Sequence, residues 1–288
     1  MISAALVIFL VLTDHHVLTE QWISIAKEDT GRIGISILIL ESGQTAAMNG
    51  SDHFPMQSVY KLPIAMAVLH RVDQGELSLE QILTIRPDEY IPANKHSPLR
   101  DQFPSGSRKT VRELIRYSLV ESDGTASDVL LRLAGGPARV NHYLRSLGIR
   151  ELVVANSEMD MTWYTQFDDW CTPRAALQLL GIIQKGPAIS ESSRTVLLSA
   201  MQESQTGENR IRHLLPKGTV VADKTGSSGT QNGRAAATND IGLVTLPDGR
   251  HLAIAIFVTD SEKPEELRDQ EIAKLARAAW DEFVQQNP

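Results

Sequence analysis

The sequence predicts a mixed α/β (α+β) fold, in which strands from both chain ends form one antiparallel sheet flanked by terminal helices. Two observations support this fold class. Strand patterns occur near both termini, whereas the residues between them have helical periodicity bounded by Ser, Thr, Pro and Gly. We therefore expect an α/β lobe from residues 18–57 and 215–288 and an inserted all-α lobe from residues 58–214. The cleft between the two lobes is the expected place for a site.

The first 17 residues resemble an export signal in some respects. Residues 1–17 contain an apolar stretch, Ile2–Leu12, that is too short to span a bilayer as a helix. No Lys or Arg precedes this stretch and no small-x-small cleavage site follows it, so we interpret residues 1–17 as an atypical or truncated export signal. The alternative is a buried strand or helix of the mature fold.

Residues 18–31 predict a helix, and isoleucine at every second position over residues 33–39 predicts a strand that turns into a hairpin.

The middle and the C-terminal parts of the chain complete the predicted fold. Thr110 and Glu113 form a capping box at the start of one helix. A Pro-Asp-Gly turn joins two strand patterns near the C-terminus. The predicted helices cover residues 61–75, 110–120, 125–135, 137–148, 172–186, 190–204 and 264–286, and the predicted strands cover residues 219–226, 240–246 and 250–260.

Composition excludes several classes of function. The 288 residues carry a formal net charge of −7 and no basic run, which argues against a nucleic-acid partner. The single cysteine, Cys171, excludes an intrachain disulfide and is expected to be a buried, inert thiol. The histidines form no His-x-x-x-His pair, so the sequence predicts no metal site.

Ser58 and Lys61 form the first candidate catalytic pair. Their spacing places both side chains on one face of a helix. A serine hydroxyl becomes a good nucleophile when a neighbouring base takes its proton, and a crowded or desolvated lysine can be that base. The pattern alone has little specificity, because a second copy, Ser24 with Lys27, occurs in a helix that is expected to be solvated.

Two further short motifs have both structural and chemical readings. Ser122-Asp123-Gly124 precedes an apolar helix, and Thr125 to Asp128 fits a capping pattern. Alternatively, a second serine in a cleft passes a proton to a leaving nitrogen, while Asp123 braces the loop. Lys224-Thr225-Gly226 ends a predicted strand, either as a glycine-rich hairpin loop or as a holder for a substrate carboxylate. The backbone N–H groups of Ser227 and Ser58 would then complete an oxyanion hole.

The three motifs in this order resemble those of class A β-lactamases and penicillin-binding proteins. The resemblance runs from about Leu18 to the C-terminal helix. It is sharper to the branch of class A serine β-lactamases that includes the PER and VEB types, and it rests on the stretches FPMQSVYKLPIAMAVL, SPLRD, SQTGENRIRHLLPKGTVVADKTGSSGT and NGRAAATNDIGLVTLPDGRHLAIAIFVTDS. The resemblance implies a β-lactamase/DD-peptidase-like fold.

The resemblance also implies further site residues. Glu158 matches the glutamate that activates the deacylating water on an omega-shaped loop, and Arg210 matches a guanidinium behind the carboxylate site. His96 takes a rim position where the family often has an aromatic residue. Thr162 stands where many family members have an asparagine that helps to hold the deacylating water, so we expect altered water binding. Gly124 also stands where the family usually has asparagine. The loss of that side chain's hydrogen bond to the substrate should cost acylation about 0.5–1.5 kcal/mol.

We therefore expect a serine β-lactamase that hydrolyses penicillins and cephalosporins, confers antibiotic resistance and uses no metal or organic cofactor. The base for acylation is either Lys61 or Glu158 acting through water, a choice that is disputed for the family as a whole. The expected partner is a small-molecule β-lactam, with no nucleic acid and no stable membrane association. A periplasmic or secreted monomer is expected. The alternatives are a D-Ala-D-Ala carboxypeptidase or a β-lactam-sensing domain without turnover.

Overall fold

The computed structural model describes residues 16–285, and its main sheet is built from both ends of that segment. The sheet is antiparallel, with five strands in the order β2-β1-β12-β11-β8. The predicted fold class is thereby confirmed. Most of the proposed export signal lies outside the described residues. The strands are β1 (Arg32–Ile39), β2 (Thr45–Met48), β8 (Val221–Ser227), β11 (Thr238–Thr245) and β12 (His251–Thr259).

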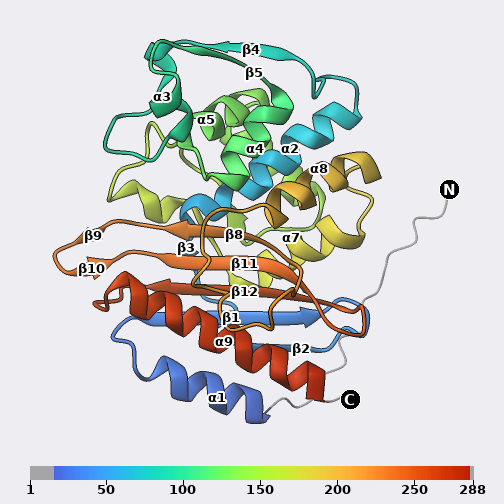
Figure 1. Ribbon diagram of the computed structural model, residues 1–288, viewed down its shortest axis with the longest axis vertical. Helices are drawn as coiled ribbons and strands as arrows, with labels where there is room; N and C mark the ends of the chain where they lie inside the picture. The colour runs from blue at the N-terminus through green and yellow to red at the C-terminus, as the bar shows by residue number, and fades with distance from the viewer. Residues whose placement is uncertain (1–15, 286–288) are drawn as a thin grey trace.

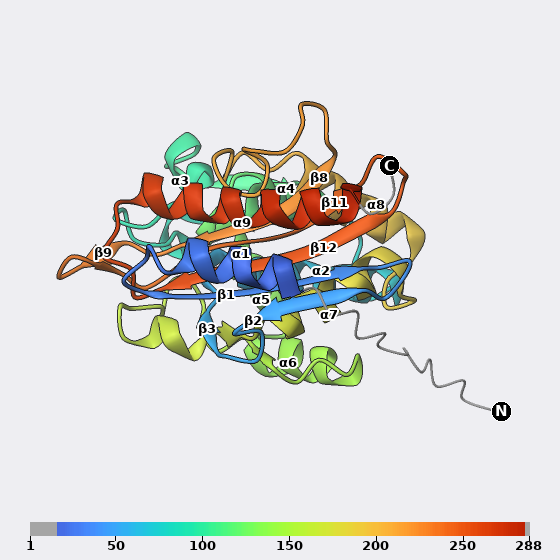
Figure 2. The ribbon, with the colours of Figure 1, turned by 90° about the horizontal axis from the view of Figure 1, so that it is seen from below.

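Two terminal helices, α1 (His16–Ala26) and α9 (Glu265–Gln285), lie side by side on one face of the sheet (Figures 1 and 2). The alternating isoleucines of β1 point to this face, where Ile35 and Ile37 are fully buried in the same apolar cluster as Trp22 of α1. Burial of this apolar surface is the driving force that holds the helices on the sheet.

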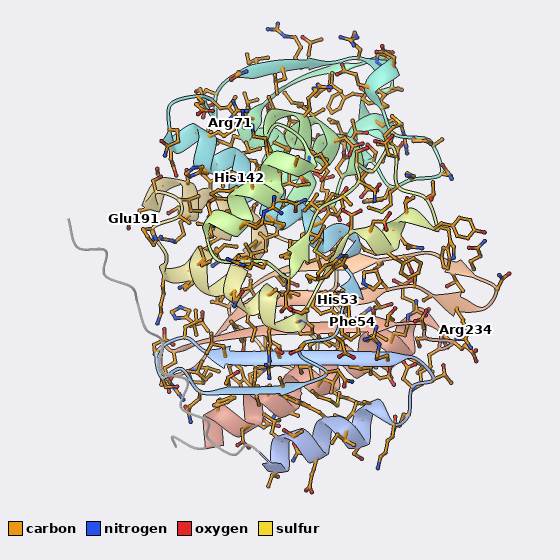
Figure 3. All side chains as sticks on the ribbon, turned by 180° about the vertical axis from the view of Figure 1, so that it is seen from behind. His53, Phe54, Arg71, His142, Glu191 and Arg234 are labelled. Atoms are coloured by element: carbon orange, nitrogen blue, oxygen red, sulfur yellow. The ribbon has the colours of Figure 1, made fainter. Side chains whose placement is uncertain are left out.

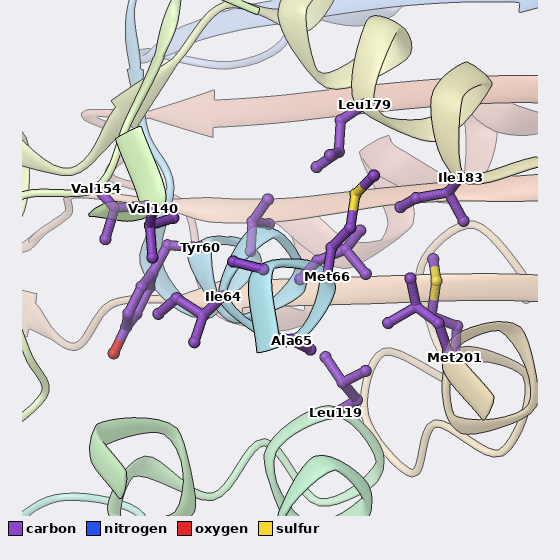
Figure 4. Packing of buried hydrophobic residues seen from close by; sticks show 14 of the residues in the cluster. Tyr60, Ile64, Ala65, Met66, Leu119, Val140, Val154, Leu179, Ile183 and Met201 are labelled. Carbon is purple, nitrogen blue, oxygen red and sulfur yellow. The ribbon is translucent and has the colours of Figure 1, made fainter. Parts of the chain in front are cut away.

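A helical layer covers the opposite face of the sheet and extends beyond its β8 edge (Figure 1). Helix α7 contacts β1 and β12, whereas α2 is surrounded by α4, α5, α6 and α8. Figure 4 shows Met66 of α2 near Leu179 and Ile183, with Leu119 and Met201 on other sides of the helix. The helices are α2 (Lys61–Asp73), α3 (Pro98–Gln102), α4 (Val111–Val120), α5 (Gly124–Leu133), α6 (Pro137–Ser146), α7 (Pro173–Lys185) and α8 (Glu191–Gln202).

Short elements connect the larger ones. The 3₁₀ turns are η1 (Gln57–Tyr60), η2 (Pro87–Glu89) and η3 (Thr165–Asp168). The short strands are β3 (Phe54–Pro55), β4 (Ile82–Ile85), β5 (Ser107–Thr110), β6 (Leu152–Val153), β7 (Trp170–Cys171), β9 (Thr230–Gln231) and β10 (Arg234–Ala235). Cys171 is fully buried, as predicted, and burial raises the pKa of its thiol. Within residues 16–285, no helix is both long and apolar enough to cross a membrane.

Candidate active site

A cleft of about 670 Å³ lies between the β8 edge of the sheet and the helical layer. Its walls include η1, the segment before α3, and residues 155–169, which we call the Ω loop. The predicted site residues that line it are Ser58, Lys61, His96, Ser122, Glu158, Thr162, Arg210, Thr225 and Ser227. Three others, Gly124, Lys224 and Gly226, are buried among their neighbours rather than lining the cleft.

Ser58 and Lys61 lie in one turn where η1 continues into α2. The backbone N–H of Lys61 donates to the carbonyl oxygen of Ser58, which fixes the three-residue spacing. Ser58 is thus at the N-terminal end of a buried helix, whose unpaired N–H groups favour negative charge. Gln57 has a left-handed φ of 49°, and its amide donates to Gln166 Oε1 at 2.5 Å. This contact ties the turn that carries Ser58 to the Ω loop.

The Lys61 ammonium contacts both the Ser122 motif and Glu158 of the Ω loop. It is 1% exposed and donates to the Ser122 carbonyl oxygen at 2.6 Å. Its Nζ is also 3.1 Å from Glu158 Oε1. Burial alone would raise the pKa of Glu158, but the cations Lys61 and Lys95 outweigh it and hold that pKa below the usual value. Glu158 is therefore an ionised carboxylate at neutral pH, available to accept a proton.

Ser122 presents its hydroxyl from a tight backbone conformation with φ of 56°. Its Oγ accepts a hydrogen bond from Lys224 Nζ at 3.0 Å, which leaves its own proton free for another acceptor. Asp123 is the N-cap of α5, accepting from Ala126 N at 2.7 Å, and it also accepts from Leu99 N at 2.7 Å. Asp123 therefore braces the loop, as predicted.

The predicted capping role of Thr125 with Asp128 is wrong. Thr125 lies inside α5, and its hydroxyl accepts from Ser97 Oγ at 2.8 Å. The Asp128 carboxylate instead accepts from the backbone N–H groups of Glu158 at 2.6 Å and Met159 at 2.8 Å. Burial raises the pKa of Asp128 to about 6, against these two hydrogen bonds. Asp128 thus holds the Ω loop, whereas Thr125 contacts the segment before α3.

β8 supplies the opposite wall of the cleft. The N–H of Ser228 donates to Ala237 O of the neighbouring chain segment at 2.9 Å. Because successive N–H groups of an extended strand point in opposite directions, the N–H of Ser227 faces away from β11, toward the cleft. A Cβ on Gly226 would come within 2.3 Å of Met56 O and 3.2 Å of Ser58 N. Glycine at this position is what allows β8 to approach the turn that carries Ser58.

Lys224 and Arg210 provide positive charge behind this strand. Lys224 is fully buried, and burial followed by repulsion from Lys61 lowers its pKa to about 7. The Arg210 guanidinium donates to Asp269 Oδ1 at 2.7 Å and to Ser227 Oγ at 2.7 Å. Arg212 instead pairs with the buried Asp223.

Arg234 is an arginine of the same C-terminal region, but it does not line the cleft. It is on β10 near the outer end of the sheet (Figure 3), where it pairs with Glu262 at 2.7 Å. Arg210, by contrast, lines the cleft.

Gly124 is not an open position. A Cβ there would be 2.4 Å from Ile91 Cδ1 and 3.1 Å from Glu158 Cγ. Ile91 is 1% exposed and fills the direction in which an asparagine side chain would start. The absent family side chain is thus replaced by apolar packing.

His96 and Thr162 are at the exposed rim. His96 Nε2 is 2.8 Å from the Glu121 carbonyl oxygen, which holds the imidazole at the edge of the cleft. The Thr162 hydroxyl is engaged with Thr165, accepting from its backbone N–H at 3.2 Å. Within residues 16–285, no group of three or more His, Cys, Asp and Glu side chains could hold a metal ion.

Sequence reasoning missed residues that organise the site from a distance. Asn239 Nδ2 donates to Pro55 O at 2.8 Å and to Met56 O at 3.1 Å, linking β11 to the turn before Ser58. The Thr206 and Thr225 hydroxyls are 2.6 Å apart. Their partners are distant in sequence, so no local pattern marks them.

A mixed sheet-and-helix fold with a serine, two lysines and a carboxylate around one cleft is that of a serine acyl-transfer hydrolase. The family model described as the beta-lactamase enzyme family matches residues 18–283. The chain belongs to this family, and within it to the class A serine β-lactamases.

The chain is similar to known β-lactamases over most of their length. The chain is 38% identical to the beta-lactamase VEB-1 of Pseudomonas aeruginosa, over 91% of this chain and 88% of VEB-1. It is 38% identical to the extended-spectrum beta-lactamase PER-1 of the same organism, over 91% of this chain and 86% of PER-1. A beta-lactamase structure from Chitinophaga pinensis has a TM-score of 0.91 and 43% identity, covering 93% of this chain and 99% of that chain. The expected branch of class A is thereby confirmed.

Proposed function

We propose that the chain hydrolyses β-lactams through an ester on Ser58, and that Glu158 activates the water that hydrolyses this ester. One observation carries this assignment most directly. The Lys61 ammonium contacts both the Ser122 carbonyl oxygen, at 2.6 Å, and Glu158 Oε1, at 3.1 Å, beside Ser58 in one cleft. A nucleophile, a base and a second hydroxyl within reach of one cation are the parts that acyl transfer needs.

In the acylation step, Ser58 Oγ loses its proton either to Lys61, after Lys61 has passed one of its own protons to Glu158, or to Glu158 through a water, and it attacks the β-lactam carbonyl carbon. The N–H groups of Ser58 and Ser227 stabilise the resulting oxyanion. The C–N bond of the ring then breaks, the Ser122 hydroxyl gives its proton to the ring nitrogen, and Ser122 regains a proton from the base that deprotonated Ser58. Thr225 and Arg210 bind the substrate carboxylate from the wall of the cleft, and the buried Lys224 of β8 attracts it through its positive charge.

Deacylation separates a β-lactamase from enzymes that stay acylated. Glu158 takes a proton from water, which attacks the ester carbonyl; the ester C–O bond then breaks, and Glu158 returns the proton to Ser58 Oγ as the ring-opened acid leaves. The lowered pKa of Glu158 supports this role, because the carboxylate is ionised before the water arrives.

Cephalosporins are the proposed preferred substrates, with extended-spectrum activity of the kind named for PER-1. We also propose a periplasmic or secreted location, on the basis of the export-signal pattern of residues 1–17. We also propose that the protein acts as a monomer.

Hydrolysis of a chromogenic cephalosporin tests the assignment of the nucleophile. We expect steady turnover by the native chain and its loss in Ser58→Ala. The matched control is Ser24→Ala, which alters the exposed second Ser-x-x-Lys copy at the end of α1 and should leave turnover unchanged. Turnover that survives in Ser58→Ala, or a single stoichiometric burst in the native chain, would contradict the proposal.

A further inference from the structure

Lys95 makes contacts that the reaction steps above do not use. Its half-buried side chain lines the cleft. Its Nζ donates to the carbonyl oxygen of Glu158 and to that of Met161, the latter at 2.5 Å. Both acceptors belong to the Ω loop, whereas Lys95 precedes α3 in another part of the chain.

The turn that carries Lys95 is itself held in place. The Lys95 N–H donates to Pro92 O at 2.9 Å. Arg100 Nη1 donates to the carbonyl oxygens of Ile91, Pro92 and Lys95, at 3.1, 2.7 and 3.1 Å. A lysine on a braced turn loses less conformational freedom when its ammonium is ordered, so it can act as a fixed support.

The backbone of Glu158 is consequently held from two sides. Asp128 accepts its N–H at 2.6 Å, and Lys95 donates to its carbonyl oxygen. Loops ordinarily sample several conformations, and a displacement of about 1 Å at a reacting group can cost about 100-fold in rate. The Glu158 carboxylate must keep its place beside Lys61 for each deacylation.

We propose that Lys95 is a positioning residue for deacylation, which fixes the Glu158 segment of the Ω loop against the cleft. The inference rests on the proposed role of Glu158 as the deacylating base. It separates two steps of the reaction: loss of Lys95 should slow hydrolysis of the ester on Ser58 while leaving its formation largely intact. The positive charge also helps to keep Glu158 ionised.

Pre-steady-state kinetics of Lys95→Met test this, with a penicillin and a cephalosporin as separate substrates. We expect the deacylation rate to fall about tenfold or more on both, with acylation changed less and acyl-enzyme accumulating. The acidic limb of the kcat–pH profile should move to higher pH, because the Glu158 pKa rises when a nearby cation is removed. Lys95→Arg, which retains the cation and several N–H donors, should restore both properties in part.

Lys109→Met is the matched control. Lys109 is also half-buried in the helical lobe, where its ammonium lies 4.0 Å from the Phe103 ring centroid, and this variant should behave like the native chain. If Lys95→Met does not fold, Lys95→Gln is used for the pH profile, and an unmoved acidic limb overturns the proposal.

Unchanged deacylation in Lys95→Met, or an equal loss in both steps, also overturns it. Glu158→Gln is measured in parallel to separate the two hypotheses. If Glu158→Gln accumulates acyl-enzyme and Lys95→Met does not, the positioning role fails while the function stands. If Glu158→Gln does not accumulate it, the assignment of the base has failed.

Discussion

Lys224 is a cation whose charge is expected to change near neutral pH. Burial and the neighbouring Lys61 lower its pKa to about 7, so the ammonium is charged below that pH and increasingly neutral above it. Because kcat/KM reports the free enzyme, we expect kcat/KM for an anionic β-lactam to fall as the pH rises above about 7. A pH series of initial rates measures this.

Lys224→Arg provides the check on that pH profile, because a guanidinium stays charged throughout the range. Its alkaline limb should therefore move to higher pH, even if the rate at neutral pH is lower. A native profile that stays flat well above pH 7, or the same limb in both proteins, would show that Lys224 does not set it.

Gly124 and Ile91 form a sterically coupled pair. An asparagine at residue 124 would supply the side chain that Gly124 lacks, but its Cβ would approach Ile91 Cδ1 to 2.4 Å. Gly124→Asn alone should therefore destabilise the protein by about 1–3 kcal/mol through overpacking and give no faster acylation. When Ile91 is already replaced by alanine, adding Gly124→Asn should cost much less stability than it does in the native chain.

Denaturant unfolding of the two single variants and the double variant measures this coupling as a double-mutant cycle. Acylation rates from the same proteins show whether the asparagine then helps catalysis. Additive stability changes, or faster acylation in Gly124→Asn alone, would mean that Ile91 moves aside freely and that the packing argument is wrong.

Individual residues were predictable where their chemistry is local in sequence. Ser58 and Lys61 are separated by one helical turn, so their spacing already implies a shared face. Lys95 had no such signal. It reaches Glu158 across 63 positions, and the contact is to backbone carbonyls, which any residue possesses.

Among the elements, periodicity predicted the long ones and failed on the short ones. The capping box of Thr110 and Glu113 starts α4, as expected. The pairs β4–β5 and β6–β7 were missed. β6 and β7 have two residues each, too few to show alternation, and β4 is mostly exposed.

The Ω loop shows why irregular elements need the structure. Asp169 holds the start of the loop by accepting from the N–H groups of Ala155 at 2.8 Å and Asn156 at 3.2 Å. Asp128 of α5 holds the middle of the loop. Sequence alone indicated that an acid would lie there, through the family resemblance, but not which contacts hold its backbone.

At the scale of the whole molecule, the site depends on how distant segments are brought together. β8 and β11 come from the C-terminal part of the chain, whereas η1 and α2 follow the N-terminal strands. Asn239 links them by donating to Met56 O across 183 positions in sequence. The sheet therefore places β8, the proposed carboxylate-binding strand, beside Ser58, the proposed nucleophile. Repeated patterns along the chain predict the sheet and helices, but contacts between segments so far apart in sequence leave no local pattern, so they could not be predicted.

Intact-protein mass spectrometry of Glu158→Gln after mixing with a cephalosporin tests the central claim most directly. Asp168→Asn, which changes an exposed acid of the same loop, is the control and should turn over normally. We predict a persistent mass increase of one substrate-derived acyl group in Glu158→Gln, mapped by proteolysis to Ser58. Absence of such an adduct with native-like turnover, or an adduct on another residue, would contradict the account.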